Sequence, residues 1–157
     1  MKFLADKRKQ KIFIITTSVV LTLAIIVGAC AIYLGDYYRA DNEAIGAFFP
    51  QGATWNEESG RIVFEPEGAT KGFIFYPGGK VEALAYIPLM EQLAQEGVLS
   101  VLMPMPFNLA VLAKNAAEGI PEQFPEVQDW YMAGHCLGGS MAASFAAENT
   151  AWVDGLI

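Results

Sequence analysis

The sequence has few of the residues that bind metals or cross-link a chain. Its 157 residues include one histidine, His135, and two cysteines, Cys30 and Cys136. A single histidine cannot build the Cys/His cluster of a zinc site, so we expect no metal, and no pattern points to a cofactor. The cysteines lie in different settings, one in a long apolar run and one in a glycine-rich segment. This separation excludes a structural disulfide between them.

Basic residues are scarce after the N-terminus. Residues 12–157 hold five Lys and Arg against 16 Asp and Glu, which gives this part a net charge of −11. Domains that bind nucleic acid present a basic surface, so this balance excludes nucleic acid as a partner. It also predicts repulsion from anionic lipid, apart from whatever anchors the chain.

Charge is absent from residues 12–34, a run of 23 residues rich in Ile, Val, Leu and Ala. About 20 apolar residues in a helix cross the hydrocarbon core of a bilayer. Residues 1–11 carry five basic side chains and one acidic one, a bias that keeps an N-terminus in the cytoplasm. The sequence therefore predicts a basic cytoplasmic segment at 1–11 and a transmembrane anchor at 12–34. The remainder would then face the outside of the cell membrane.

The apolar run could instead be a lipoprotein signal or a cleaved signal peptide. The segment Ile26–Cys30 resembles a bacterial lipoprotein signal, in which Cys30 would become the lipidated first residue, yet the apolar run continues to Leu34. A cleaved signal peptide usually has a shorter apolar core of about 7 to 15 residues. We therefore expect an uncleaved single-pass anchor. An anchor, a lipoprotein signal and a cleaved signal would all place the following domain outside the cytoplasm.

The rest of the chain alternates strand-like and helix-like segments. Residues 35–60 have mixed charge and turn residues and are predicted to form a juxtamembrane stalk. From residue 61 the order of strands and helices predicts an α/β domain, with a mainly parallel sheet and flanking helices, over residues 61–157. The expected strands are 61–65 (an outer strand), 72–76, 98–103, 130–133 and 152–157, and the expected helices are 88–97, 108–119 and 140–147.

The most informative segment is Gly134-His-Cys-Leu-Gly-Gly139, which lies between a strand-like and an Ala-rich, helix-like stretch. A sharp strand-to-helix turn needs small residues two positions before and after its apex, so that strand and helix can approach each other. Gly134 and Gly138 meet that need around Cys136. The apex side chain then stands at the helix N-terminus, where free N–H groups favour an anion. The pattern predicts a nucleophile elbow.

This segment resembles the G-x-S-x-G motif of the α/β-hydrolase superfamily of esterases, lipases and dienelactone-hydrolase-like enzymes, with Cys in place of Ser. A second segment, Gly72–Lys80, is similar to the family's early core strand and its oxyanion loop. The resemblance implies a small-molecule acyl substrate, Cys136 at the nucleophile position and the backbone N–H groups of Leu137 and Gly79 as oxyanion donors. Gly78 and Lys80 are weaker binding candidates.

Each of these residues could also have no catalytic role. The Pro-Gly-Gly segment would then be an ordinary turn at the end of a strand, Lys80 a solvated surface charge and Cys136 a buried, unreactive thiol. His135 is a poor general base because it directly precedes the nucleophile, whereas a triad histidine approaches from another loop. We expect it to pack or hydrogen-bond beneath the elbow.

The family's pattern puts the triad acid and then the histidine after the nucleophile, and no histidine follows Cys136. The sequence therefore predicts a membrane-anchored extracytoplasmic hydrolase that is truncated after the elbow helix and inactive as given. The alternative is a non-catalytic or fragmentary hydrolase-like membrane protein. A third possibility is an anchor whose tail pairs with another polypeptide that completes the sheet. The oligomeric state is not predicted.

Overall fold

The computed structural model describes residues 2–41, 43, 45–46, 53–56 and 60–157. The chain divides into two compact units, Met1–Asp36 and Tyr37–Ile157. Each unit is described by itself.

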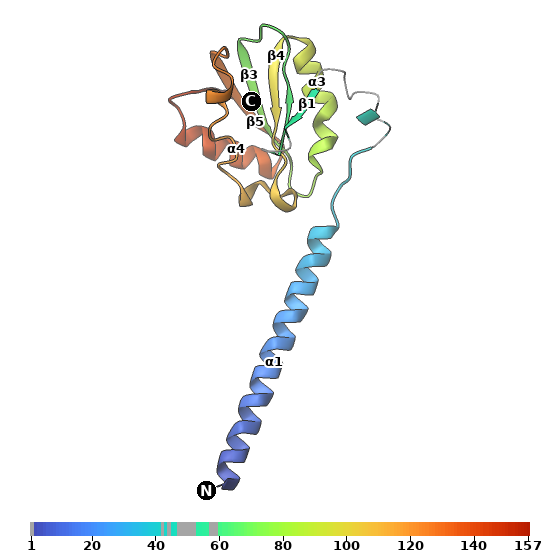
Figure 1. Cartoon of the computed structure of the whole chain (residues 1–157), viewed down its shortest axis with the longest axis vertical. Helices are drawn as coiled ribbons and strands as arrows, with labels where there is room; N and C mark the ends of the chain where they lie inside the picture. The colour runs from blue at the N-terminus through green and yellow to red at the C-terminus, as the bar shows by residue number, and fades with distance from the viewer. Residues whose placement is uncertain (1, 42, 44, 47–52, 57–59) are drawn as a thin grey trace. The chain divides into compact units, whose positions relative to one another are not determined.

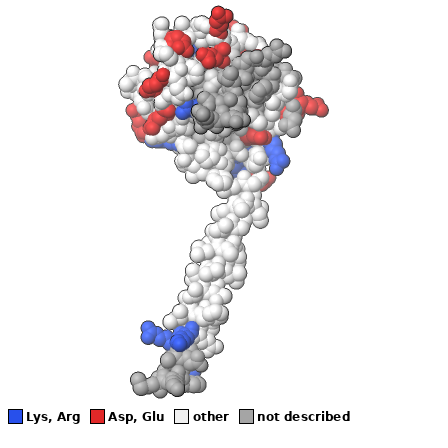
Figure 2. Space-filling view, in the orientation of Figure 1, with Lys and Arg blue, Asp and Glu red and all other residues white. Residues whose placement is uncertain are grey.

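The first unit is one helix, α1 (Lys2–Gly35). Within its stretch Lys7–Gly35, an 18-residue window has a mean hydropathy of 2.5, and none of that window is buried. Figure 2 shows Lys and Arg gathered near the N-terminal end of this stretch and an uncharged shaft after them. By length and composition the helix can cross a membrane, as a signal sequence also could. This is the helix that the apolar run 12–34 predicts.

The second unit is built on a six-stranded sheet with the strand order β1-β2-β4-β3-β5-β6 (Figure 1). Strand β3 runs parallel to β4 and β5, and β5 runs parallel to β6, whereas β2 is antiparallel to both β1 and β4. The sheet is therefore mainly parallel, as predicted. The strands are β1 (Ala53–Asn56), β2 (Arg61–Phe64), β3 (Lys71–Tyr76), β4 (Val98–Leu102), β5 (Asp129–Gly134) and β6 (Val153–Leu156).

Helices cover both faces of this sheet, with α3 (Ile87–Gln95) on one side and α4 (Leu137–Glu148) on the other (Figure 1). The period of two along β3 sends Phe73 and Phe75 into the core that includes Ile87 of α3, and Ile74 into the core that includes Phe145 of α4. Strand β3 is consequently buried on both faces, which explains its unbroken apolar sequence.

Two predictions about the start of this unit differ from the structure. The sequence predicts an outer strand at 61–65, but β2 lies between β1 and β4. It predicts a stalk at 35–60, yet β1 is part of the sheet and Tyr38 pairs with Val81. Val81 lies far along the chain from Tyr38, so local composition does not indicate that pairing. Strands β1 and β2 are close in sequence, and β1 is a strand that the sequence analysis overlooked.

The predicted helix over 108–119 is wrong. Two short 3-10 turns, Pro106–Asn108 and Ala110–Leu112, and further turns occupy this stretch. Phe107 and Asn108 have φ values of 53° and 55°, which no helix accepts. The Tyr76 hydroxyl also stabilises this non-helical conformation. It donates a hydrogen bond to the Lys114 carbonyl and accepts one from the Ala117 N–H. The other predicted strands and helices are present, with ends shifted by a few residues.

Candidate functional site

The strand β5, the two residues His135 and Cys136, and the helix α4 form the predicted elbow, with Cys136 at its apex. Cys136 caps the N-terminus of α4 with φ 52° and ψ −115°, and its side chain is exposed. A non-glycine residue with positive φ is strained and persists only where its surroundings impose it. The strain therefore marks Cys136 as a residue held in place by the strand and the helix around it.

Close backbone contact explains the glycines around this apex. A Cβ on Gly134 would lie 2.5 Å from the Gly138 carbonyl carbon, and a Cβ on Gly138 would collide with the carbonyl oxygens of Tyr76 and Pro77. Backbone atoms at this spacing leave no room for a methyl group. The two glycines thus allow β5, α4 and the end of β3 to meet beside Cys136.

The loop after β3 brings a second peptide to the elbow. A Cβ built on Gly79 would lie 3.2 Å from Leu137 Cδ2 and 3.9 Å from Leu109 Cδ2. Within the described part of the chain, neither the Gly79 nor the Leu137 N–H donates to a protein acceptor. Two unpaired N–H groups from separate segments next to an exposed thiol match the arrangement that an oxyanion hole requires. The structure thus brings together Cys136, Leu137 and Gly79.

A tyrosine that the sequence did not indicate joins this loop to the elbow. The Tyr86 hydroxyl accepts the Gly78 N–H at 3.1 Å and lies 2.8 Å from Nδ1 of His135. Either group can be the donor in this contact, because the tautomer of His135 decides which of them carries the proton. Burial raises the pKa of Tyr86, the Gly78 N–H lowers it, and the nearby charge of Cys136 raises it again. Only this spatial arrangement identifies Tyr86 as part of the site.

His135 makes the hydrogen bond that we expected, but its side chain is exposed rather than buried under the elbow. Its Nδ1 is used by Tyr86, and its ring centroid lies 6.1 Å from the Tyr86 ring centroid. The geometry therefore gives this histidine a contact with the oxyanion loop.

Lys80 has φ 59° and takes part in the site through its backbone. Its N–H donates to the Asn108 carbonyl at 2.8 Å, and its carbonyl accepts the Tyr38 N–H at 2.8 Å. The oxyanion loop is thus fixed from two sides, by the loop after β4 and by the segment that follows α1. Asn108 and Tyr38 are two more contributors that sequence patterns did not indicate.

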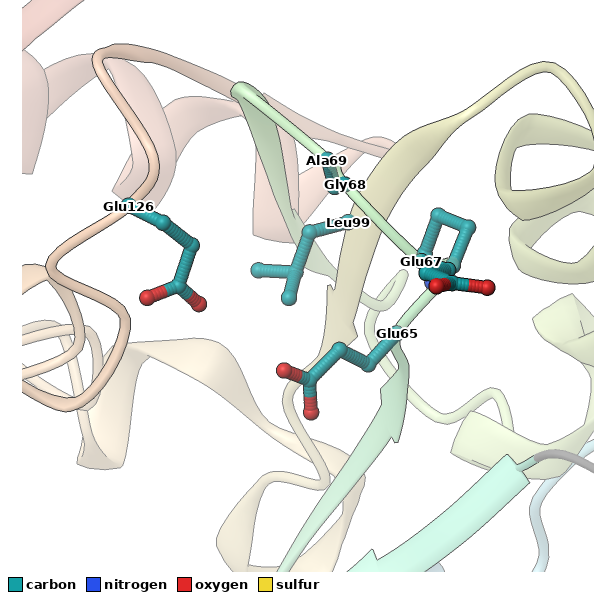
Figure 3. Close-up of a pocket in the computed structure, with 7 residues that line it drawn as sticks. Glu65, Glu67, Gly68, Ala69, Leu99 and Glu126 are labelled. Carbon is teal, nitrogen blue, oxygen red and sulfur yellow. The ribbon is translucent and has the colours of Figure 1, made fainter.

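A cavity of about 350 Å³ lies away from these residues, at the turn between β2 and β3 (Figure 3). Glu65 and Glu126 stand on either side of Leu99 there, and Glu67 lies on the same turn. None of the predicted site residues lines it. In the described residues no group of His, Cys, Asp or Glu is arranged to hold a metal ion. The cavity is therefore separate from the elbow chemistry.

Comparison with known proteins agrees with this geometry. A family model described as alpha/beta hydrolase family matches residues 72–157, from β3 through the oxyanion loop and the elbow to β6. A search of curated proteins found no match to the sequence. Because the family match covers more than half of the chain, this protein belongs to the alpha/beta hydrolase family.

Proposed function

We propose that this protein is a membrane-anchored, extracytoplasmic member of the family that acts on an ester or related acyl bond through Cys136. The observation that carries the proposal is the exposed thiol at the N-terminus of α4, next to the unpaired N–H groups of Gly79 and Leu137. These groups stabilise negative charge where acyl transfer develops it.

The chemistry follows from these positions. The Cys136 thiolate attacks the acyl carbon, and the carbonyl oxygen becomes an oxyanion that accepts hydrogen bonds from the Leu137 and Gly79 N–H groups. Collapse of this intermediate breaks the bond to the leaving alcohol, which takes up a proton, and leaves a thioester on Cys136. Water then hydrolyses the thioester, releasing the acid and restoring the thiol.

Proton transfer in these steps needs an acid–base group. The only histidine in the sequence, His135, directly precedes the proposed nucleophile, and its Nδ1 forms a hydrogen bond with the Tyr86 hydroxyl. We infer that repeated turnover depends on a carboxylate and an imidazole supplied from outside these 157 residues. The same observation favours a second function, a hydrolase-like domain that binds acyl compounds without turning them over.

Anchoring is supported by α1, whose apolar stretch is long enough to cross a bilayer, and by the basic residues before it. The proposed orientation has residues 1–11 in the cytoplasm and Tyr37–Ile157 outside. The membrane is the proposed partner, and residues 12–34 are the stretch that would cross it.

Single-turnover acylation tests the proposed nucleophile without requiring the missing base. The full chain, in detergent and carrying Cys30→Ser, is mixed with p-nitrophenyl acetate, and the acetylated residue is identified by peptide mass mapping. We expect one acetyl group per chain on Cys136, formed faster than on the same protein unfolded in urea. Cys136→Ala should take up none. Equal rates in folded and unfolded protein would contradict an activated or assisted thiol.

A further inference from the structure

The strained residues of the second unit gather in three loops. Among the residues that the structure describes, four that are not glycine have positive φ, and each lies in the loop after β3, β4 or β5. They are Lys80 (φ 59°), Phe107 (φ 53°), Asn108 (φ 55°) and Cys136 (φ 52°). A non-glycine residue in this left-handed conformation is strained, and such strain is found mainly at functional sites. The loop after β4 is therefore a candidate part of the site that contains Cys136.

The three loops lie at one edge of the sheet. Strand β3 lies between β4 and β5 and is parallel to both, so the three strands end at the same carboxyl edge. The helices α3 and α4, which follow β3 and β5, cover opposite faces of the sheet (Figure 1). In open α/β sheets, ligands bind at the carboxyl edge where neighbouring connections leave to opposite faces. The three loops thus occupy the position of a ligand site, whatever the chemistry of Cys136.

Contacts fix the loop after β4 beside the loop after β3. The Asn108 carbonyl accepts the Lys80 N–H at 2.8 Å. A Cβ built on Gly79 would lie 3.9 Å from Leu109 Cδ2 and 3.2 Å from Leu137 Cδ2, and both leucine side chains are partly exposed. Gly79 and Leu137 carry the proposed oxyanion donors. The Leu109 side chain is therefore within reach of a group that binds to those donors.

Phe107 exposes its ring in this loop although residues on both sides of it are buried. Met105 is 6% exposed and Ala110 is fully buried, both in the core that includes Phe145 of α4, whereas Phe107 is 67% exposed. Burial of a phenylalanine ordinarily stabilises a fold, and positive φ is unfavourable for a bulky residue. In the described part of the chain, the Phe107 ring belongs to neither hydrophobic core. The ring is thus available to a ligand of the neighbouring site.

We propose that Phe107 and Leu109 form an apolar subsite next to Cys136, and that this subsite receives the hydrocarbon chain of the acyl group. The preferred substrate is then an ester of an apolar acid of several carbons rather than an acetyl ester. Leu109, beside Gly79, contacts the part of the chain near the carbonyl group, and the Phe107 ring covers a part farther from it. The subsite rests on the strain, the exposure and the contacts of the loop after β4. Its assignment to an acyl chain rests on the proposed function.

Reagents that transfer an alkylthio group to a thiol test the subsite without any hydrolysis. The full chain with Cys30→Ser, in detergent, is treated with methyl or hexyl methanethiosulfonate. Each reagent forms a mixed disulfide with Cys136 and releases methanesulfinate, and the measured quantity is the ratio of the hexyl to the methyl rate constant. Phe107→Ala should lower this ratio about fivefold, because each buried methylene contributes a factor of about four. Phe107→Leu, which keeps an apolar side chain, should retain most of it.

Leu89→Ala is the matched control for loss of an exposed apolar side chain. Leu89 is 42% exposed and lies on α3, which covers the other face of the sheet from α4. Its ratio should equal that of the starting protein, because detergent takes up the hexyl reagent equally in both samples. Circular dichroism checks the fold, and the polar variant Phe107→Gln carries the test if Phe107→Ala does not fold. A ratio that none of the Phe107 variants changes would overturn the subsite.

Esters separate the subsite from the proposed function. The same proteins are acylated once with p-nitrophenyl acetate or p-nitrophenyl hexanoate, and Phe107→Ala should lower the hexanoate-to-acetate rate ratio about fivefold. Selection by chain length among the thiosulfonates, without acylation by either ester, would support the subsite and overturn the hydrolase function. Acylation at a rate ratio that does not depend on Phe107 would overturn the subsite and leave the function standing. If Cys136 reacts with neither thiosulfonate, the thiol is inaccessible and both proposals fail.

Discussion

The hydroxyl oxygen of Tyr86 lies 2.8 Å from Nδ1 of His135, and this contact connects the two halves of the site. The same oxygen accepts the N–H of Gly78, which precedes the predicted oxyanion donor Gly79. Tyr86 thus forms hydrogen bonds with the loop after β3 and with His135, the residue before Cys136. An oxyanion hole works only when its donors are fixed at the position where charge develops. The position of Gly79 relative to Cys136 therefore depends on Tyr86, which supplies neither the thiol nor a proposed oxyanion donor.

Tyr86→Phe should slow acetylation of Cys136 by p-nitrophenyl acetate about tenfold while the protein stays folded. The phenylalanine removes both hydrogen bonds but keeps the ring that packs on Phe75 at a centroid distance of 4.8 Å. Loss of a whole oxyanion donor reduces rates by about 10² to 10³, and a displaced donor should have a smaller effect. Circular dichroism checks the fold. Tyr131→Phe, in the adjacent strand β5, serves as the control and should react at the wild-type rate, as Tyr86→Phe would if the contact were irrelevant.

Gly138→Ala should lower the free energy of unfolding by about 3 kcal/mol or more, because the new methyl group meets the carbonyl oxygens of Tyr76 and Pro77 and no flexible side chain can yield. Gly119→Ala separates this collision from simple backbone strain. Gly119 has φ +73° and open space around its Cβ position, so alanine there should lower stability by only about 1 kcal/mol. Urea unfolding in detergent, followed by tryptophan fluorescence, gives both values. Similar losses in the two variants would contradict the close approach at Gly138.

Alkaline pH should destabilise the second unit through Tyr76. Burial raises the pKa of this tyrosine to about 12, above the ordinary value near 10 of an unfolded chain. A raised folded-state pKa gives stability that is complete below about pH 10 and is lost as the pH rises towards 12. The loss should reach up to about 2 kcal/mol. Tyr76→Phe should be less stable at pH 7, because the Lys114 carbonyl and the Ala117 N–H lose their partner. Between about pH 10 and 12, the free energy of unfolding should fall less for this variant than for the wild type. Equal losses in the two proteins would mean that a group other than Tyr76 titrates.

Topology can be tested with tags at the two ends. A tag at Met1 should be protected from protease added to intact cells, and a tag after Ile157 should be cleaved, because the basic residues before position 12 favour a cytoplasmic N-terminus. Permeabilised cells, in which both tags are cleaved, provide the control. Retention of the Met1 tag at full length also distinguishes the uncleaved anchor from lipoprotein processing at Cys30. The opposite pattern of protection would reverse the proposed orientation.

The sequence predicts those parts of the fold that depend on neighbouring residues. The apolar run of β3, the proline in the first turn of α3 and the glycines of the elbow are local signals, and the structure has the corresponding elements. The predicted helix after Asn108 is absent because Lys80 and Tyr76, both distant in sequence, fix that stretch in another conformation. Tyr86 escapes sequence analysis for the same reason, since 49 residues separate it from His135. Contacts between residues so far apart in the sequence cannot be predicted from periodicity or composition.

The 157-residue chain should show no esterase turnover above background, even where the predicted single acetylation of Cys136 takes place. General acid–base assistance contributes a factor of about 10² to 10⁴ in rate. The single histidine of the sequence is hydrogen-bonded to Tyr86, so we do not expect it to give this assistance. The thioester on Cys136 should therefore persist for as long as it does on a small-molecule thiol. The measurement is continuous release of p-nitrophenol after the first equivalent, compared between wild type and Cys136→Ala. Appending a family segment with a carboxylate and then a histidine should restore turnover. If the unextended protein turns over and both Cys136→Ala and His135→Asn abolish the activity, His135 is the general base and the requirement for an outside imidazole is wrong.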